Sequence, residues 1–470
     1  MKFSTSADLT KKYDVVIVPF YEGAKLACKA SLFSPKNLGP IATKDFKGKE
    51  KECALVYEGE KRFLLLGLGK GQNIRRCYAE AVSHCTKKKL KSIAALVLEK
   101  GSIYDLADGL LLANYAFDEY RKEKTTLIQS CALIGGSNTQ LKECEHAAKV
   151  MEGVYLTRDL INGNADEITP ARLAKEATQM ATKYTSVKTK VLTEAQIKKE
   201  KMGLFLAVAK SSAAKPHFII CEYRGDPKAK EHTVIVGKGV TYDTGGLNLK
   251  PTGYMETMKA DMSGSASALG IIKAAAETKI KANVTIVIAA TENSIDAESY
   301  KPGDVFTGMN GMSVEIGNTD AEGRLTLADA LSYSVKHLKP TRMIDMATLT
   351  GAIVIALGQE RSGLFTENKA LEKALVEAGE STGEKVWPMP MDDEYRELLK
   401  SDIADISNCG GRQAGSTTAA LFLKEFVGKV PWAHLDIAGT AYLDKGKFLD
   451  TTHASGVGVR LLIRFLEGKK

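Results

Sequence analysis

Three charged residues at alternate positions, Asp320, Glu322 and Arg324, form the segment of this chain that is best suited to chemistry. They lie in V-E-I-G-N-T-D-A-E-G-R-L-T-L-A-D-A at residues 314–330. In extended chain, alternate side chains point the same way, so an extended conformation would aim both carboxylates and the guanidinium at one spot. The segment would then be a strand-to-helix connection, where α/β folds often hold functional residues. The structural alternative is an ordinary helix N-terminus, which acidic side chains also favour.

Four more charged residues occur upstream, in a glycine-rich segment after an apolar run at residues 233–236: Lys238, Asp243, Lys250 and Asp261. If the fold brings the two aspartates to Asp320 and Glu322, four carboxylates repel one another and raise their own pKa values. Two divalent ions such as Mg²⁺, Mn²⁺ or Zn²⁺ would neutralise these charges, and a carboxylate can bridge such a pair. The residues therefore predict a two-metal site.

The basic residues of these segments fit the same site in two roles. Lys238 can be a metal ligand only when it is neutral, a form that burial beside two cations favours. Lys250 and Arg324 would remain as cationic donors that stabilise an oxyanion. None of the seven His falls in these segments, which disfavours two-metal enzymes that depend on imidazole ligands, and His434 is interpreted as a structural residue. The H-E-x-x-H and G-x-S-x-G patterns are also missing.

The length and composition predict a soluble protein of two domains. A chain of 470 residues exceeds one ordinary core, and 44% hydrophobic with 26% charged residues is typical of globular proteins. We expect an N-terminal α/β domain at residues 1–160 with a role in assembly or regulation. A larger catalytic α/β domain is expected at residues 161–470, with a mixed central sheet flanked by helices.

Short runs of Val, Ile and Leu that alternate with helical patterns support this fold class. Strands are predicted at residues 15–18, 54–57, 63–68, 93–97, 132–134, 205–208, 217–221, 233–236, 284–289, 312–316 and 343–347. Helices are predicted at residues 79–85 and 106–120, up to Asn162, after an N-cap at Thr169, and from Leu325 onward.

Other features of the sequence exclude several kinds of protein. The eight Cys show neither paired nor regular spacing, so free thiols are expected. The net charge is +8, but the basic run from Lys87 to Lys91 is interpreted as a solvated helix end, and no nucleic-acid partner is expected. Residues 1–13 lack the apolar core of a signal peptide, and no apolar run is long enough to span a membrane. We therefore expect a cytoplasmic protein with no membrane partner.

Six segments together resemble the M17 leucyl aminopeptidase family. They are V-G-K-G-V-T-Y-D-T-G-G at 236–246, K-P at 250–251, M-K-A-D-M at 258–262, N-T-D-A-E-G-R-L at 318–325, A-T-L-T-G-A at 347–352 and W-A-H-L-D-I-A-G at 432–439. Their order and approximate spacing follow the family, and they cover most of the chain after residue 160. The first third matches the family only in general character.

The resemblance implies a dinuclear aminopeptidase that releases N-terminal Leu and other hydrophobic residues from peptides with a free N-terminus. One metal would be held by Asp243, Asp320 and Glu322, and the other by Lys238, Asp243, Asp261 and Glu322. The two metals would be Zn²⁺, Mn²⁺ or one of each, with Mg²⁺ or Co²⁺ as alternatives, and a bridging hydroxide would attack the scissile carbonyl. Lys250 would stabilise the oxyanion, and Arg324 would hold a bicarbonate that transfers the proton.

The resemblance also implies a substrate pocket and an assembly. The pocket for the first side chain maps to five small or apolar positions: Met258, Thr348, Gly351, Ala438 and Ala441. The family assembles as homohexamers. This chain departs from the family at Ser263-Gly264-Ser265, where relatives usually have Gly-Gly-Ala, and at Ala441, often Met in relatives. These departures concern the size of the pocket and the substrate preference.

Two other functions stay open at this point. A different two-metal hydrolase, for example one acting on phosphoesters, could use the same carboxylates, although paired Lys238 and Lys250 without His argue against it. A DNA-binding regulator on the same scaffold is the second alternative, but the sequence has no cluster of basic and aromatic residues.

Overall fold

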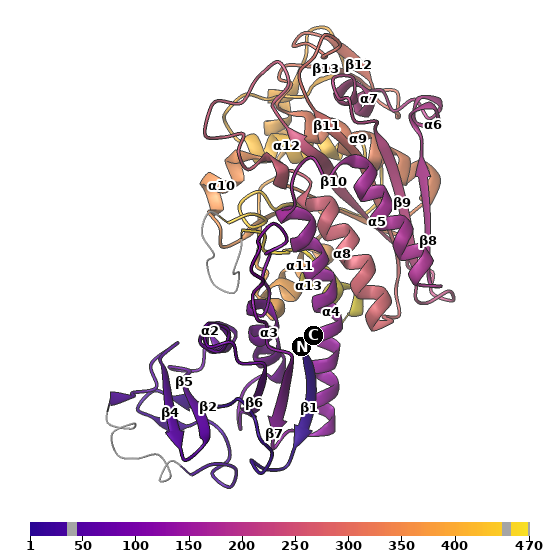
Figure 1. Ribbon diagram of the computed structural model, residues 1–470. Helices are drawn as coiled ribbons and strands as arrows, with labels where there is room; N and C mark the ends of the chain where they lie inside the picture. Colours follow the sequence, from indigo (N-terminus) through magenta and orange to yellow (C-terminus); the bar gives the residue numbers. More distant parts are fainter. Residues whose placement is uncertain (35–44, 444–452, 469–470) are drawn as a thin grey trace. The chain divides into compact units, whose positions relative to one another are not determined.

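The computed structural model describes residues 1–34, 45–443 and 453–468, and these divide into two compact units (Figure 1). The first unit runs from Met1 to Met151, and the second begins at Glu152. The division falls inside helix α4 (Asn138–Asn162). The domain boundary proposed between residues 160 and 161 lies further along the same helix and stays a prediction.

The first unit is built on a largely parallel sheet with strand order β1-β7-β6-β2-β5-β4, and β3 pairs with β2. Its strands are β1 (Lys2–Ser6), β2 (Val15–Tyr21), β3 (Lys25–Leu26), β4 (Cys53–Glu58), β5 (Lys61–Gly67), β6 (Ser92–Leu96) and β7 (Ser130–Ile134). The central strands are continuous apolar runs because a parallel sheet is buried on both faces. The five strands predicted in this part of the chain are confirmed.

In the described part of the first unit, the helices include α2 (Ile74–Lys87), α3 (Ile103–Ala113) and the first part of α4. Helix α2 ends at Lys87, so the basic run follows a helix end as predicted. The predicted helix at residues 106–120 is wrong beyond Ala113. The side chain of Asn114 exchanges two hydrogen bonds with the backbone of Ile128, at 2.9 and 2.8 Å, and these bonds turn the chain away from the helix axis.

The second unit contains a mixed sheet of eight strands in the order β16-β15-β18-β14-β10-β11-β9-β8. The strands are β8 (Val187–Leu192), β9 (His217–Arg224), β10 (Thr233–Asp243), β11 (Asn283–Asn293), β14 (Arg342–Ala347), β15 (Ser362–Phe365), β16 (Val386–Pro388) and β18 (Trp432–Asp436). Strand β10 is parallel to both of its neighbours, whereas β9 is antiparallel to β11. The mixed α/β sheet predicted for this part of the chain is confirmed.

Helices cover both faces of this sheet (Figure 1). One face carries α5 (Pro170–Lys183), α8 (Ser263–Thr278), α11 (Lys369–Thr382) and α13 (Val459–Glu467). The other face carries α7 (Gly203–Ala209), α9 (Glu322–Tyr333) and α12 (Gly415–Lys424). Consecutive residues of β10 therefore face different helices, since Gly237 lies against α8 and Lys238 against α9.

Shorter elements complete the second unit. They are α6 (Glu194–Lys199), η2 (Met258–Ala260), β12 (Val305–Thr307), β13 (Ser313–Glu315), the π-helical turn η3 (Ser334–Leu338), α10 (Gly351–Leu357), η4 (Asp393–Leu399) and β17 (Ile406–Ser407). Strands β12, β13 and β17 form a separate small sheet. Strand β13 ends at Glu315, and the connection that carries Asp320 leads from there to the start of α9 at Glu322.

The strand predicted at residues 205–208 is wrong, because these residues belong to helix α7. A short apolar run is ambiguous between a buried strand and a buried helix. Here Gly203 lets the helix begin against the backbone, since a Cβ at this position would lie 2.2 Å from the Thr307 carbonyl oxygen. The carboxylate of Asp329 on α9 also accepts the Phe205 N–H at 2.8 Å in the first turn of α7.

All eight Cys are free, as predicted. Among the described residues, no helix combines the length and the apolarity needed to cross a membrane.

Candidate metal centre

The acidic and basic residues predicted to act together come from the carboxyl end of β10 and from the segments next to it. Lys238 and Asp243 are on β10 itself, and Lys250 is in the loop that follows. Asp261 lies between η2 and α8, while Asp320 precedes α9 and Glu322 is its first residue. Ligands of α/β sheets commonly bind outside the carboxyl ends of central strands, and this cluster has that position.

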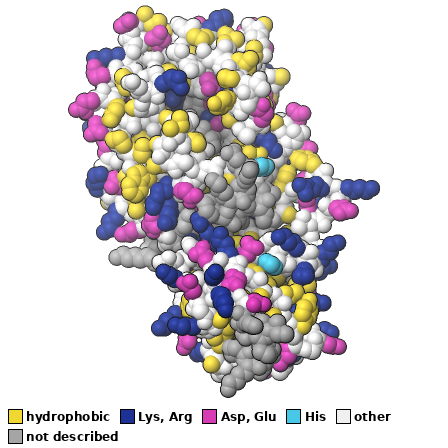
Figure 2. Space-filling view, turned by 90° about the vertical axis from the view of Figure 1, so that its left-hand side faces the viewer, with side chains coloured by type: hydrophobic (Ala, Val, Ile, Leu, Met, Phe, Trp, Pro, Cys, Tyr) yellow, Lys and Arg dark blue, Asp and Glu magenta, His cyan; other side chains and the backbone are white. Residues whose placement is uncertain are grey.

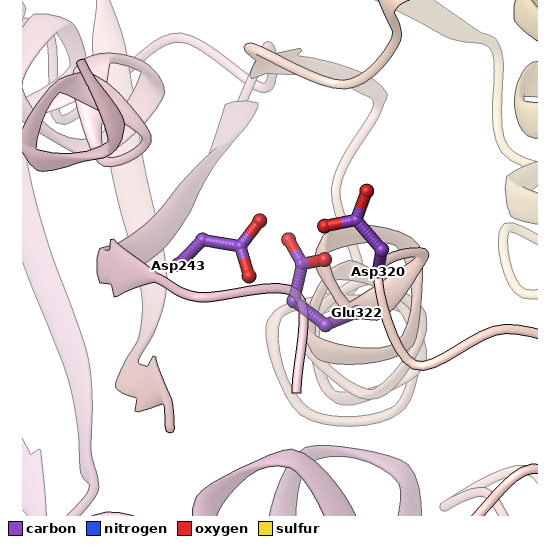
Figure 3. Close-up of side chains that lie close together, drawn as sticks. All are labelled: Asp243, Asp320 and Glu322. Carbon is purple, nitrogen blue, oxygen red and sulfur yellow. The ribbon is translucent and has the colours of Figure 1, made fainter. Parts of the chain in front are cut away.

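Three of the predicted carboxylates converge. Asp243, Asp320 and Glu322 each offer an oxygen within 4.8 Å of the others, and Figure 3 shows their carboxyl groups pointing toward one another. Lys250 lies against two of them, with Nζ 2.8 Å from Asp243 Oδ2 and 2.5 Å from Asp320 Oδ1. These ion pairs place a cation where the two carboxylates meet.

The extended conformation predicted for residues 320–324 is wrong, because α9 begins at Glu322. Asp320 and Glu322 converge across the start of the helix, but Arg324 is one half-turn further along it. Its Nη1 donates to the carbonyl oxygen of Asn408 at 2.7 Å, and among the described residues no ion pair joins Arg324 to Asp320 or Glu322.

Lys238 connects the fourth carboxylate to this group. Its Nζ lies 2.7 Å from Asp261 Oδ1 and 2.9 Å from Glu322 Oε1, and it donates to the Thr348 carbonyl oxygen at 3.0 Å. The side chain passes so close to α9 that a Cβ at Gly323 would lie 2.4 Å from Lys238 Cε. The absence of a side chain at Gly323 therefore leaves the space that the lysine side chain occupies on its way to the site.

The cluster is buried, and burial decides its electrostatics. Desolvation raises the pKa of Glu322 to about 8, with a further contribution from the charge of Asp243 that exceeds the opposing effect of Lys238. Desolvation likewise raises the pKa of Asp261 to about 6 and raises the pKa of Asp320. Burial lowers the pKa of Lys238, but the surrounding carboxylates raise it above its ordinary value. The two lysines alone therefore do not fully stabilise the ionised carboxylates.

Buried carboxylate oxygens without a hydrogen-bond partner indicate whether divalent cations fit these residues. Within the described part of the chain, Asp261 Oδ2 and Glu322 Oε2 are buried and have no hydrogen-bond partner. A buried carboxylate oxygen without a partner is unfavourable unless a cation or donor satisfies it. Carboxylate oxygens are suitable ligands for Mg²⁺, Mn²⁺ and Zn²⁺, so the donor set fits divalent metals.

The residues proposed for the substrate pocket have different surroundings. Met258 on η2 and Ala438 after β18 are half-buried, Gly351 at the start of α10 is exposed, and Ala441 is fully buried. Thr348 contacts the acidic cluster directly, because its Oγ1 donates to Asp261 Oδ1 at 2.8 Å. The unusual Ser263 and Ser265 are fully buried, and each donates to a nearby carbonyl oxygen, of Ala260 at 2.5 Å and of Met262 at 2.7 Å.

Asparagines that hold the ligand-bearing segments are not among the residues predicted from the sequence. Asn408 is fully buried, and its side-chain oxygen accepts from Gly317 N at 2.8 Å and Asn318 N at 3.2 Å. Its Nδ2 donates to the Asn318 carbonyl oxygen at 2.8 Å. The signal available was N-C-G-G between two apolar runs, which indicates only a turn.

This fold and this donor set define a metalloenzyme of the α/β class. Family models agree: residues 155–463 match the cytosol aminopeptidase family catalytic domain, and residues 17–124 match the N-terminal domain of the same family. A probable cytosol aminopeptidase of Protochlamydia amoebophila is 49% identical over 97% of this chain and 96% of its own length. One from Chlamydia trachomatis serovar D is 44% identical over 98% and 97%.

Solved structures give the same result. A tomato leucine aminopeptidase mutant has a TM-score of 0.88 at 33% identity, covering 100% of this chain and 96% of its own. The bottromycin maturation enzyme BotP in complex with Mn also has a TM-score of 0.88, at 29% identity, covering 97% and 99%. The chain belongs to the cytosol aminopeptidase family, peptidase family M17, and is a metal-dependent aminopeptidase. These matches give no support to a phosphoester hydrolase or a DNA-binding regulator.

Proposed function

We propose that the active site holds two divalent ions, one bound by Asp243, Asp320 and Glu322. Lys238 and Asp261 would bind the other ion, with Asp243 and Glu322 shared between the two. The observation that carries this proposal is the convergence of three carboxylates beside buried carboxylate oxygens that have no hydrogen-bond partner in the described chain. Mn²⁺ is the first candidate, since a related structure contains Mn, and Zn²⁺, Mg²⁺ and Co²⁺ have suitable ligand chemistry.

Lys250 is the residue proposed to stabilise the oxyanion. Bound divalent cations supply the positive charge that polarises a carbonyl and lowers the pKa of a water molecule. The Lys250 side chain is 14% exposed, so it can reach a substrate from the rim of the cluster while Asp243 and Asp320 hold it in place. A fixed ammonium group in a poorly solvated site stabilises developing negative charge more strongly than water does.

Arg324 is the residue proposed to hold a bicarbonate. The guanidinium is buried, Nη1 is used by Asn408, and Nε has no hydrogen-bond partner among the described residues. A planar guanidinium with free donors is suited to a planar carboxylate-like anion, which it binds through two parallel hydrogen bonds. A bicarbonate held there would accept and return the proton that the reaction moves.

The proposed substrates are peptides with a free N-terminus and a first residue such as Leu. Met258, Thr348, Gly351, Ala438 and Ala441 would form the pocket for that residue. The Thr348 contact with Asp261 supports this placement, because it puts the pocket next to the metal ligands. A homohexamer and a cytoplasmic location are proposed on the strength of family membership. No nucleic-acid or membrane partner is proposed, and Figure 2 shows Lys and Arg interspersed with Asp and Glu on the face it presents.

Two matched substrates test this proposal. Wild-type protein loaded with Mn²⁺ should hydrolyse Leu-Gly-Gly and leave N-acetyl-Leu-Gly-Gly intact, because the free amine is part of what the site recognises. Lys250→Ala should lower kcat by about 100-fold or more, the usual effect of removing an oxyanion donor. Lys228→Ala, a change at an exposed lysine of the same unit, is the control. Equal cleavage of both peptides, or full activity of Lys250→Ala, would contradict the assigned roles.

A further inference from the structure

Asn293 ends strand β11 directly beside the carboxyl end of β10. The two strands are parallel, and their last paired residues are Asp243 and Asn293. The register shifts between Val240 and Asp243, an irregularity that turns the end of β10 and brings the Asp243 side chain to Asn293. Asn293 is fully buried, so its amide must bond to protein groups instead of bulk water.

The amide nitrogen of Asn293 binds two of the segments that carry candidate ligands. Nδ2 donates to Asp243 Oδ1 at 2.7 Å and to the Thr319 carbonyl oxygen at 3.1 Å. Both neighbours are acceptors only, so the nitrogen must face them and the amide orientation is fixed by chemistry. Thr319 directly precedes Asp320. One side chain therefore ties the last residue of β10 to the segment before α9.

The remaining contacts divide the two oxygens of Asp243 between two kinds of neighbour. Asp243 Oδ1 accepts from Asn293 and also from the Gly245 N–H at 2.8 Å, whereas Oδ2 faces Lys250. Two donors on Oδ1 hold the plane of the carboxylate and direct Oδ2 into the cluster. These contacts therefore fix the orientation of the Asp243 carboxylate, as outer-shell hydrogen bonds do for metal ligands.

Further hydrogen bonds fix the position of Thr319, and with it the backbone that leads into Asp320. Its carbonyl oxygen also accepts from the Tyr300 hydroxyl at 2.8 Å, and its own Oγ1 donates to the Gly245 carbonyl oxygen at 2.7 Å. The oxygen of the Asn293 amide, in contrast, is buried and has no hydrogen-bond partner in the described chain. The contacts that hold the Asn293 side chain in place are therefore those of its nitrogen with Asp243 and Thr319.

We infer that Asn293 is a positioning residue of the metal centre, which fixes Asp243 as a ligand and sets its separation from Asp320. The inference rests on the proposed two-metal site. Outer-shell partners of metal ligands typically change metal affinity 10- to 100-fold when they are removed. Loss of the Nδ2 donor should therefore weaken metal binding by about that factor.

The other end of the same strand provides a matched control. Asn283 begins β11, and its side chain also joins backbone segments, with Nδ2 donating to the Asp226 carbonyl oxygen at 2.7 Å and Oδ1 accepting from Asp226 N at 3.2 Å. Ten residues of extended strand put it about 33 Å from Asn293. Leu is close to Asn in shape but has no donor, so Asn293→Leu and Asn283→Leu each remove an amide without deleting volume.

Titration with Mn²⁺ tests the inference, with free Mn²⁺ measured by its electron paramagnetic resonance signal. Asn293→Leu should raise the Kd for Mn²⁺ about 10- to 100-fold, while Asn283→Leu leaves it within about twofold of wild type. Urea unfolding of both variants without metal gives their free energies of unfolding, which measure any purely structural effect. Asn293→Ser, whose hydroxyl is too short to reach both acceptors, should also bind Mn²⁺ more weakly and replaces the Leu variant if that fails to fold.

Three outcomes would overturn the inference. Wild-type Mn²⁺ affinity in the folded Asn293 variants would show that Asn293 has no role in metal binding. An equal rise in Kd for Asn283→Leu would show that the effect is a general loss of stability. Failure of wild-type protein to bind Mn²⁺ would remove the proposed metal centre and the inference with it.

Discussion

The carbonyl oxygen of Asn408 accepts a hydrogen bond of 2.7 Å from Nη1 of Arg324, a residue 84 positions earlier in the chain. The side chain of the same asparagine bonds the backbone on both sides of Asn318, in the segment that carries Asp320. Asn408 thus connects a candidate metal ligand and a candidate catalytic guanidinium. The geometry of both depends on a residue that contributes no chemistry of its own.

Replacement of Asn408 should therefore affect activity and stability together. Asn408→Ala leaves Gly317 N and the Asn318 backbone without their buried partners, which should lower the free energy of unfolding by about 2–4 kcal/mol. Urea unfolding and kcat/KM on a leucyl amide measure the two effects. Asn114→Ala, which removes a comparable buried amide in the first unit, should lower stability and leave metal-saturated activity unchanged. Unchanged kcat/KM in Asn408→Ala would contradict this role.

Gly323 should tolerate no side chain while Lys238 is present. Ala is about 1 kcal/mol better than Gly in a helix, so Gly323→Ala favours α9 itself. Its Cβ would nevertheless displace Lys238, and Mn²⁺ affinity should fall about tenfold. A double-mutant cycle with Lys238→Met provides the test, because the Gly323 substitution should have little further effect once the lysine is gone. An equal loss of affinity in both backgrounds would mean that Gly323 acts in another way.

The buried pair of His434 on β18 and Asp345 on β14 predicts a pH dependence of stability. His434 Nδ1 lies 2.6 Å from Asp345 Oδ1, which supports the interpretation of His434 as a structural residue. Burial lowers the pKa of His434, but the charge and hydrogen bond of Asp345 raise it above the ordinary 6.5. The folded state then keeps a proton that the unfolded chain releases. The pair's contribution to stability is therefore present below pH of about 6.5 and is lost as the pH rises through the folded pKa.

Urea unfolding measured between pH 6 and pH 9, in steps of about half a pH unit, tests this dependence. The stability difference between wild type and Asp345→Asn should shrink as the pH rises, because only the wild type holds the charged pair. Asp393→Asn, a change at an exposed carboxylate, should give a difference that does not vary over this range. A constant difference for Asp345→Asn would mean that His434 is neutral throughout.

The exposed Gly351 offers a test of the proposed pocket. A Cβ at this position would meet no heavy atom within 4 Å, so a larger side chain should leave the free energy of unfolding within about 0.5 kcal/mol. Gly351→Leu should lower kcat/KM for a leucyl amide relative to an alanyl amide by about tenfold or more, because the added side chain occupies the space of the first residue. Ala356→Leu, exposed on the same helix, should leave this ratio unchanged. An unchanged ratio in Gly351→Leu would place the pocket elsewhere.

Local patterns predicted most of the strands and several of the ligand-bearing segments. Strand β10 was recognisable because its apolar run ends in glycines and charges. The grouping of Asp243 with Asp320 and Glu322 was implied by the family resemblance, and charge neutralisation by metal ions gives it a physical reason. The direction of Arg324 was not predictable in this way. Whether residue 322 or 325 begins the helix changes where that side chain points, and helix boundaries are the weakest part of a pattern-based prediction.

Long-range contacts account for the rest of what was missed. The roles of Asn293 and Asn408 depend on partners that are 50 and 84–91 positions away, and a single Asn in a turn or at a strand end carries no sign of them. Helix α7 was predicted as a strand because its burial between sheet and α9 makes it apolar on all sides. In both cases tertiary packing, and not local preference, decides the outcome.

Activity on a leucyl amide after metal removal and return tests the central claim most directly. Metal-stripped protein should be inactive, and activity should return as about two Mn²⁺ bind per subunit. Asp320→Ala should bind fewer ions and stay inactive under the same conditions, while Asp393→Ala behaves as wild type. Full activity in the stripped protein, or in Asp320→Ala, would contradict an aminopeptidase mechanism that depends on this carboxylate cluster.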